Sequence, residues 1–259
     1  MQHFLRFYFG EGRPQIIFRN FEQVGLLELE AGKYADLDFS SRICCIGYKS
    51  PDGFCPCPNS AIHIRQCPTC SFRDISRAYT VGDFSAYPQL YEEAKQEEYC
   101  VYLAQFGANI TKCGVTRTQR FESRMLEQGA DFGCIIARFI GPDQVYQAEA
   151  EIQSRFMLAN SVRMSQKLRL LSFDRQEAIE HLRQAVELVR SSQILPDFEP
   201  KIQDFTQFYP KINGVQLADS ILGRVLGAKG EILFFRSDLG RDFAVNMRQK
   251  VGTFFEVRQ

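Results

Sequence analysis

The sequence predicts an α+β protein with an α/β core, a cysteine-rich module and β-rich segments at both ends. Three observations predict this class. Short apolar runs separated by Gly and Pro predict strands in the first forty and last sixty residues. Apolar residues at helical spacing predict helices in the middle of the chain. Six of the nine Cys residues lie between positions 44 and 70.

Composition limits the class of protein. The chain has 259 residues, 45% of them hydrophobic, and 31 Lys and Arg balance 31 Asp and Glu. These values exclude disorder over most of the chain and a surface coated in positive charge, but they allow a local basic groove. No apolar run is long enough to cross a membrane and no export signal is visible, so we expect a cytoplasmic protein without a membrane partner. The composition does not indicate an oligomeric state.

The patterns divide the chain into four segments. They are a β-rich N-terminal segment, a zinc-ribbon-like module with an acidic connector, an α/β domain and a β-rich C-terminal segment, over residues 1–41, 42–99, 100–192 and 193–259. The outer segments contain apolar runs bounded by turn residues, which predict strands at 4–9, 16–18, 24–29, 231–235, 243–246 and 253–257. The N- and C-terminal strands could share one sheet.

The third segment alternates strands and helices. Strands are expected at 101–104, 110–115 and 134–140, with a turn at 107–109 between the first two. Helices are expected at 118–128, 143–159 and 174–191. Asp143 is a candidate N-cap of the second helix, because its carboxylate can accept a bond from a free N–H of the first turn.

Clustered Cys residues in a chain without an export signal indicate a metal site before they indicate disulfides. Cys67 and Cys70 form a Cys-x-x-Cys pair, and Cys45 begins a second knuckle because Gly47 lets the backbone turn back toward a metal. Pro residues interrupt this stretch, so little regular structure is expected there, and a metal would supply the stability.

The expected ligands of a structural zinc ion are Cys45, Cys57, Cys67 and Cys70. Cys55 is the main rival of Cys57, Cys44 also lies within reach in sequence, and His63 could substitute. Four Cys ligands leave no open coordination position, so the zinc would be structural. Free thiols or a disulfide knot are the alternative. The other Cys residues lie in expected strands and fit a core, namely Cys100, Cys113 and Cys134.

The segment from residue 101 carries the most informative motif. Tyr102 lies ten residues before Lys112, which begins Lys-Cys-Gly-Val-Thr-Arg, and Arg124, Glu149 and Asn160 follow. This order resembles the GIY-YIG nuclease fold over residues 101–160. In that fold a first tyrosine, a Y-I-G-x-T strand, a helical arginine, a metal-binding glutamate and a late asparagine converge on one phosphodiester.

A second resemblance covers most of the chain. The Cys knuckles and the "GVTR…R…EQGA" segment are similar to a prokaryotic family catalogued as domain of unknown function 2797. That label implies no activity, so the chemistry has to be argued from the residues.

The nuclease resemblance implies a role for each matching residue. Tyr102 would be the general base or would position water, and Arg124 would stabilise charge on the transferring phosphate. Glu149 would hold a divalent cation, Mg²⁺ by preference, with Asn160 near it. Lys112 replaces the second tyrosine of the motif and would contact the phosphate or, if desolvated, have a lowered pKa.

A second departure from the motif is Gln128, near a position that often holds His. Together with Lys112 it implies either a variant active site or a binding site that has lost hydrolysis.

Helical spacing supports a role for Glu149 independently. Val145, Ala148, Ile152 and Phe156 form one apolar arc of the expected helix, and Glu149 falls inside it. A carboxylate on a core-facing arc is costly unless it is paired or metal-bound. The alternative is a carboxylate satisfied by a neighbouring Arg.

Basic residues gather around the same motif. The expected nucleic-acid contacts are Lys112, Arg117, Arg120, Arg163 and Lys167. Such residues could follow a phosphate backbone and make binding salt-dependent. The alternative is a solvated helix face, because Glu residues are interspersed among them.

The sequence therefore predicts a protein that binds DNA or RNA, and the nuclease resemblance implies cleavage of phosphodiesters with a divalent metal. The alternatives are a non-catalytic nucleic-acid or ribonucleoprotein adaptor, and a nucleic-acid-modifying enzyme that reuses the nuclease scaffold. A protein–protein adaptor is the fourth option.

Overall fold

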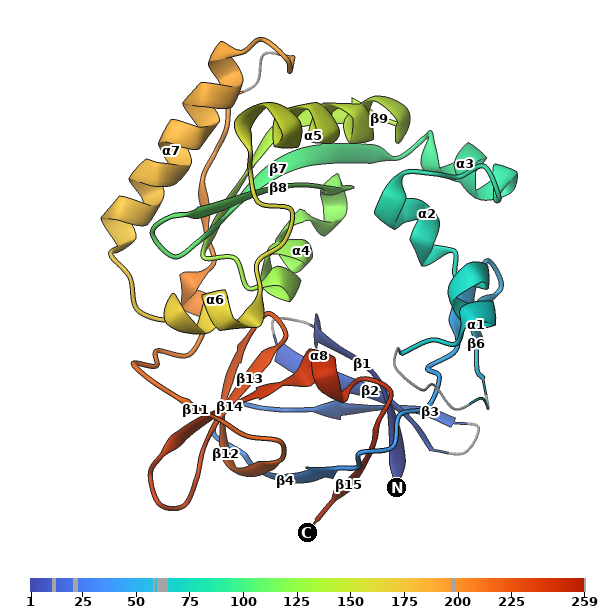
Figure 1. Cartoon of the computed structure of the whole chain (residues 1–259), viewed down its shortest axis with the longest axis vertical. Coiled ribbons are helices and arrows are strands. Elements are labelled where there is room, and N and C mark those ends of the chain that lie inside the picture. The colour runs from blue at the N-terminus through green and yellow to red at the C-terminus, as the bar shows by residue number, and fades with distance from the viewer. Residues whose placement is uncertain (11–12, 21–22, 58, 60–64, 197–198, 259) are drawn as a thin grey trace. The chain divides into compact units, whose positions relative to one another are not determined.

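The computed structural model describes the chain except for residues 11–12, 21–22, 58, 60–64, 197–198 and 259 (Figure 1). Its contacts divide the chain into two units. The terminal unit contains Met1–Tyr79 and Gly214–Gln259, and the inserted unit contains Thr80–Asn213. The limits of these units do not coincide with the segment boundaries expected from the sequence. The α+β class is confirmed, since both units contain helices and sheets.

A nine-stranded sheet forms the terminal unit, in the order β11-β14-β13-β12-β4-β15-β1-β2-β3. The strands from the N-terminal part of the chain are β1 (Gln2–Gly10), β2 (Arg13–Asn20), β3 (Gln23–Glu28) and β4 (Tyr34–Phe39). Those from the C-terminal part are β11 (Gln216–Leu217), β12 (Ile221–Lys229), β13 (Ile232–Arg236), β14 (Asp242–Asn246) and β15 (Phe254–Val257). β15 pairs with both β1 and β4, so strands from the two ends of the chain do share one sheet.

Aromatic side chains hold these strands together. Phe4 and Phe255 are fully buried, and the ring of Phe255 lies 5.8–6.2 Å from those of Phe4, Phe18 and Phe39. Buried aromatic pairs of this kind add to the area that the sheet removes from water. The unit also contains a short helix α8 (Met247–Lys250), whose Met247 is buried.

The cysteine-rich stretch contains more regular structure than the sequence indicates. β5 (Tyr48–Ser50) and β6 (Gly53–Cys55) form a hairpin, and α1 (Pro68–Arg73) follows. Pro68 occupies the first turn of α1, where a missing N–H costs nothing, so the proline starts a helix instead of excluding one. α2 (Ser76–Val81) spans the boundary between the two units.

The inserted unit contains a four-stranded sheet in the order β10-β9-β7-β8. Its strands are β7 (Glu98–Phe106), β8 (Ile110–Arg117), β9 (Phe132–Ile140) and β10 (Gln203–Asp204). Helices α5 (Asp143–Phe156) and α7 (Arg175–Ser191) bury their apolar arcs against one face, around Leu103 and Cys134. α4 (Phe121–Gln128) lies on the other side of β7 and β8 from α5 (Figure 1).

The remaining elements of the inserted unit are short. They are α3 (Pro88–Ala94), α6 (Met164–Arg169), η1 (Thr118–Arg120) and η2 (Thr206–Phe208). The expected strands and the three long helices of this unit are present. The prediction that Asp143 caps α5 is wrong, because Pro142 is the N-cap residue and Asp143 is already helical. Its carboxylate instead accepts a hydrogen bond from Tyr91 Oη at 2.6 Å. Cys100, Cys113 and Cys134 are fully buried, as expected for core residues.

Among the helices of the described chain, none is long and apolar enough to cross a membrane.

Candidate functional site

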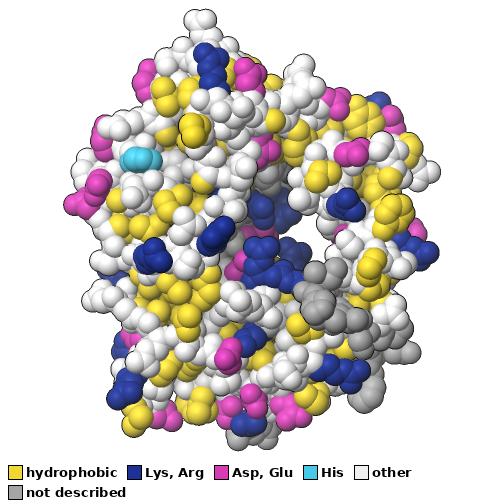
Figure 2. All heavy atoms as spheres, in the orientation of Figure 1, with side chains coloured by type: hydrophobic (Ala, Val, Ile, Leu, Met, Phe, Trp, Pro, Cys, Tyr) yellow, Lys and Arg dark blue, Asp and Glu magenta, His cyan; other side chains and the backbone are white. Residues whose placement is uncertain are grey.

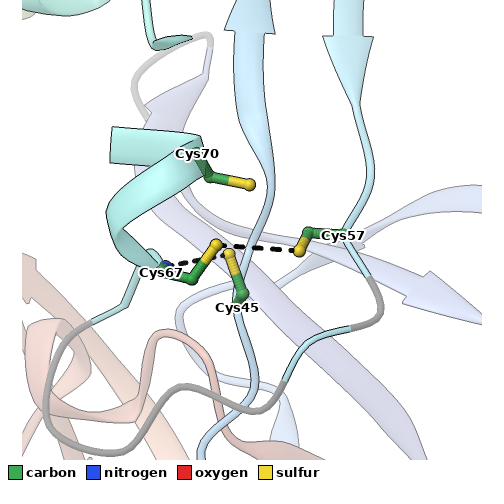
Figure 3. A group of neighbouring side chains, drawn as sticks. All are labelled: Cys45, Cys57, Cys67 and Cys70. Carbon is green, nitrogen blue, oxygen red and sulfur yellow. Dashed lines mark hydrogen bonds between the residues drawn. The ribbon is translucent and has the colours of Figure 1, made fainter. Parts of the chain in front are cut away.

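Four cysteine sulfurs meet in the terminal unit. Cys45, Cys57, Cys67 and Cys70 place their Sγ atoms within 4.8 Å of one another, and Figure 3 shows the side chains pointing toward a common centre. The Cys57 and Cys67 sulfurs are 3.9 Å apart. Tetrahedral zinc with Zn–S bonds of about 2.3 Å needs an S–S separation of roughly 3.8 Å, so this set fits a metal ion such as zinc.

The backbone around the cluster supports the sulfurs. Gly47 N–H donates to Cys45 Sγ at 3.4 Å and Cys67 N–H donates to the same sulfur at 3.2 Å. Gly47 has φ +84°, and a β-carbon there would lie 2.2 Å from the carbonyl oxygen of Cys55. The turn after Cys45 therefore requires glycine.

The four thiols differ in acidity. The backbone N–H of Cys70 and the neighbouring thiols lower the pKa of Cys67 to about 6, although partial desolvation opposes this shift. Burial raises the pKa of Cys45 and of Cys70. A metal that binds here would displace protons from the thiols that still carry them.

The two rivals of Cys57 lie outside the cluster. Cys55 donates instead to Ser50 Oγ at 3.6 Å, and Cys44 is buried but is not one of the clustered sulfurs. His63 falls outside the described residues.

A second group of polar side chains lies in the inserted unit, and Gln128 is its centre. Gln128 Nε2 donates to Tyr102 Oη at 2.9 Å, and Gln128 Oε1 accepts from Lys112 Nζ at 2.6 Å. Tyr102 is on β7, Lys112 on β8 and Gln128 in the last turn of α4. The bridge therefore joins two strands and a helix on the side of the sheet that α4 covers.

Arg124 and Glu149 complete this group. Both charges affect the pKa of Lys112. Burial and the positive charge of Arg124 lower this pKa to about 8, and the negative charge of Glu149 opposes the shift. Burial raises the pKa of Glu149 against the pull of Lys112 and Arg124. Glu149 also accepts from Gln153 Nε2 at 3.0 Å, so its place on the apolar arc of α5 is compensated by partners.

Tyr102 is the most enclosed member. Its side chain is 1% exposed, and burial raises the pKa of its hydroxyl above the usual 10.0. The phenol thus keeps its proton at neutral pH. Its ring lies 6.0 Å from that of Phe121, in an edge contact that fixes its position against α4.

Asn160 lies close to β8 through the backbone. The residue before it, Ala159, forms an isolated parallel bridge with Lys112, and its N–H donates to the Thr111 carbonyl at 3.2 Å. Asn160 itself is exposed.

The expected nucleic-acid contacts differ in their surroundings. Arg117 pairs with Glu97 at 2.6 Å, and Arg120 pairs with Glu127 at 2.9 Å. Arg163 is exposed before α6, whereas Lys167 is only 9% exposed and places its ammonium 5.6 Å from the centre of the Phe106 ring. A phosphate would reach Arg163 most easily and Lys167 least.

Positive and negative side chains are mixed on the face of the molecule that Figure 2 shows. Asp and Glu side chains are interspersed among Lys and Arg side chains over much of this face, in keeping with the balanced composition.

The bridging role of Gln128 could not be found from the sequence. Its position is evident only as a departure from a motif, because its partners Tyr102 and Lys112 lie 26 and 16 residues earlier. The spacing on α4 gives the one available signal, since Arg124 and Gln128 are four residues apart and share a helix face.

The chain belongs to the family described as "Protein of unknown function (DUF2797)", whose model matches residues 32–255. The match spans the cysteine cluster and the Gln128-centred group. No curated protein and no solved structure matches the chain.

Proposed function

We propose that the inserted unit binds nucleic acid and cleaves its phosphodiesters with a divalent metal, and that the four cysteines hold structural zinc. The observation that carries the cleavage proposal is that Gln128 joins Tyr102 to Lys112, while the charges of Arg124 and Glu149 both act on Lys112. Apart from Gln128, these are the positions that match the nuclease motif, and they come from four separate elements.

The residues of this group fit distinct tasks. Lys112 and Arg124 supply positive charge for a phosphate; Arg124 pairs with Glu127 at 3.4 Å but keeps a side chain that is 41% exposed to solvent. Tyr102 keeps its proton, so it would orient the attacking water as a hydrogen-bonding partner instead of removing a proton. Gln128 holds Tyr102 and Lys112 at a fixed separation.

The case for Mg²⁺ rests on Glu149. Among the described residues, only the cysteine cluster gathers three or more metal-ligating side chains, so Glu149 belongs to no group of that size. Mg²⁺ commonly binds through one or two carboxylates and takes its other ligands from water and substrate phosphate. A carboxylate beside two cations fits Mg²⁺ only together with a phosphate, and the metal would then polarise that phosphate.

The test compares two glutamates of one helix. Glu149→Gln should abolish cleavage of mixed DNA and RNA substrates in Mg²⁺ or Mn²⁺, while Glu151→Gln, an exposed site on α5, should retain it. Circular dichroism and melting temperature check that both variants fold. Retained metal-dependent cleavage by Glu149→Gln would contradict this mechanism.

A non-catalytic nucleic-acid adaptor is the second candidate. The observation that favours it is Lys112 in the place of the second motif tyrosine, already hydrogen-bonded to Gln128. An adaptor would bind without added metal, and Glu149→Gln would leave its gel shift unchanged. A cytoplasmic location stays a prediction for either candidate.

A further inference from the structure

The terminal unit contains an open pocket next to the cysteine cluster. The cavity has a volume of about 540 Å³ and is lined by Ile43, Arg65, Gln66, Ser71, Arg248, Gln249 and Val251. This volume lies within the range of roughly 300–1,000 Å³ typical of small-molecule sites.

The side chains that line the pocket carry a net positive charge. Arg65 and Arg248 contribute two guanidinium groups, and no carboxylate belongs to the lining. Arg248 Nη1 forms an ion pair with Glu231 at 3.5 Å, and the N–H groups on the other guanidinium nitrogens can still donate to a ligand. Within the described part of the chain, no ion pair or side-chain hydrogen bond is found for Arg65. The two guanidiniums line one cavity, so an anion bound between them would offset their like charge, which Glu231 offsets only from outside the lining.

The frame of the pocket is held by the backbone. Ile46 N–H donates to the Arg65 carbonyl at 2.8 Å, and Cys44 N–H donates to the Gly252 carbonyl at 2.8 Å. The first bond joins two parts of the cysteine stretch, and the second joins that stretch to the segment that follows α8. Gln66 is part of this frame as well, because its Nε2 donates to the Gly47 carbonyl at 2.8 Å.

Two of the lining residues are adjacent to candidate metal ligands. Gln66 precedes Cys67, and Ser71 follows Cys70, with Ser71 N–H donating to the Cys67 carbonyl at 2.9 Å. An ion at the cluster would therefore hold one wall of the pocket in place.

We propose that this pocket binds a phosphorylated organic ligand, with the phosphate between Arg65 and Arg248. Paired guanidiniums match the fork geometry of phosphate oxygens, and the Ser71 hydroxyl adds a neutral donor. The cavity is larger than a phosphate ion, and Ile43 and Val251 offer an apolar surface for the rest of the ligand. A nucleotide unit, free or within a nucleic acid, combines these properties. The proposal goes beyond the cleavage function and does not rest on it.

The test uses the zinc-loaded full chain and three probes. Inorganic phosphate and AMP are titrated by calorimetry, and a fluorescent single-stranded oligonucleotide is titrated by anisotropy. The variants are Arg65→Gln, Arg248→Gln and the double variant. Arg241→Gln is the matched control, because Arg241 is exposed in the same unit and does not line the pocket. Melting temperature and zinc content are measured for every variant.

AMP should bind the wild type, and each pocket variant should bind it roughly tenfold more weakly, because one charge-assisted contact is lost. The control should bind as the wild type does. AMP binding identifies a phosphomonoester as the source of the phosphate, and oligonucleotide binding without AMP binding identifies a diester. The proposal is overturned if the wild type binds neither, if the double variant binds as well as the wild type, or if Arg241→Gln weakens binding equally.

Lys112→Met separates this site from the group in the inserted unit. It should leave AMP binding at the Arg65–Arg248 pocket unchanged. AMP binding that is lost in Lys112→Met and kept in the double arginine variant would overturn the proposal while leaving the cleavage function standing.

Discussion

Tyr102 lies directly opposite Gly114 across strands β7 and β8, and its phenol occupies the space above the glycine. A β-carbon at position 114 would lie 2.4 Å from Tyr102 Oη. The absence of a side chain on β8 therefore determines where the hydroxyl of β7 can sit, and it brings that hydroxyl to Gln128.

Replacing this glycine should displace the phenol. Gly114→Ala is expected to cost about 1–3 kcal/mol of stability, the usual range for overpacking a filled site. Urea denaturation followed by circular dichroism measures the loss. Gly214→Ala is the control, since no atom lies within 4 Å of a β-carbon there. Equal stability of the two variants would show that Tyr102 moves aside without cost.

Removing the bridging amide should weaken the same group. Gln128→Leu keeps the approximate size of the side chain and leaves the Tyr102 hydroxyl and the Lys112 ammonium without this partner. We expect a loss of about 1–3 kcal/mol, because half-buried polar groups lose their hydrogen bonds. Gln147→Leu changes an exposed amide on α5 and serves as the control. A melting temperature equal to that of the control would contradict the bridging role.

Lys112 should make stability depend on alkaline pH. Its pKa falls from 10.5 to about 8 on folding, mainly through burial, so between these values the unfolded chain holds a proton that the folded chain has released. Stability contributed at this site therefore rises as the pH increases from 8 to 10.5.

The measurement compares the wild type with Lys112→Met in reductant and without divalent cations. The free energy of unfolding of the wild type should rise relative to the variant by at most about 3 kcal/mol across this window, at ~1.4 kcal/mol per pKa unit. A difference that stays constant with pH would refute the burial of this charge.

The cysteine cluster should bind a single zinc ion per chain. Cys45→Ser, Cys57→Ser, Cys67→Ser and Cys70→Ser should each reduce the zinc content measured by mass spectrometry, and chelation should lower the melting temperature of the wild type. Cys55→Ser should retain full zinc content, because its sulfur lies outside the cluster. Loss of zinc in Cys55→Ser alone would reassign the ligands.

Local patterns predicted the parts of the fold that depend on neighbours in sequence. α7 begins after Asp174, whose carboxylate accepts from Glu177 N–H at 3.0 Å, and an N-cap of this kind is visible in the sequence. The end of α5 was not predictable. Met157 ends the helix with φ +50°, a conformation that a sequence pattern assigns to Gly, and the chain then returns to β8 through Ala159.

Pairings between distant segments were beyond local patterns. The sequence pattern predicts no strand before residue 231 in the C-terminal segment, yet Ile221–Lys229 forms β12, which pairs with β4 nearly two hundred residues earlier. The four cysteines of the cluster were predictable because Cys-x-x-Cys spacing fixes one pair. The choice of Cys57 over Cys55 depends on where the hairpin β5–β6 ends, which only the fold decides.

The interrupted terminal unit has a consequence for synthesis on the ribosome. β4 pairs with β12 and β15, so this strand waits for partners that are translated about two hundred residues later. The inserted unit, in contrast, is one continuous stretch and can complete its sheet while the terminal strands are still incomplete. Nascent β4 would expose unpaired backbone groups during this interval, and such groups can pair with strands of other chains.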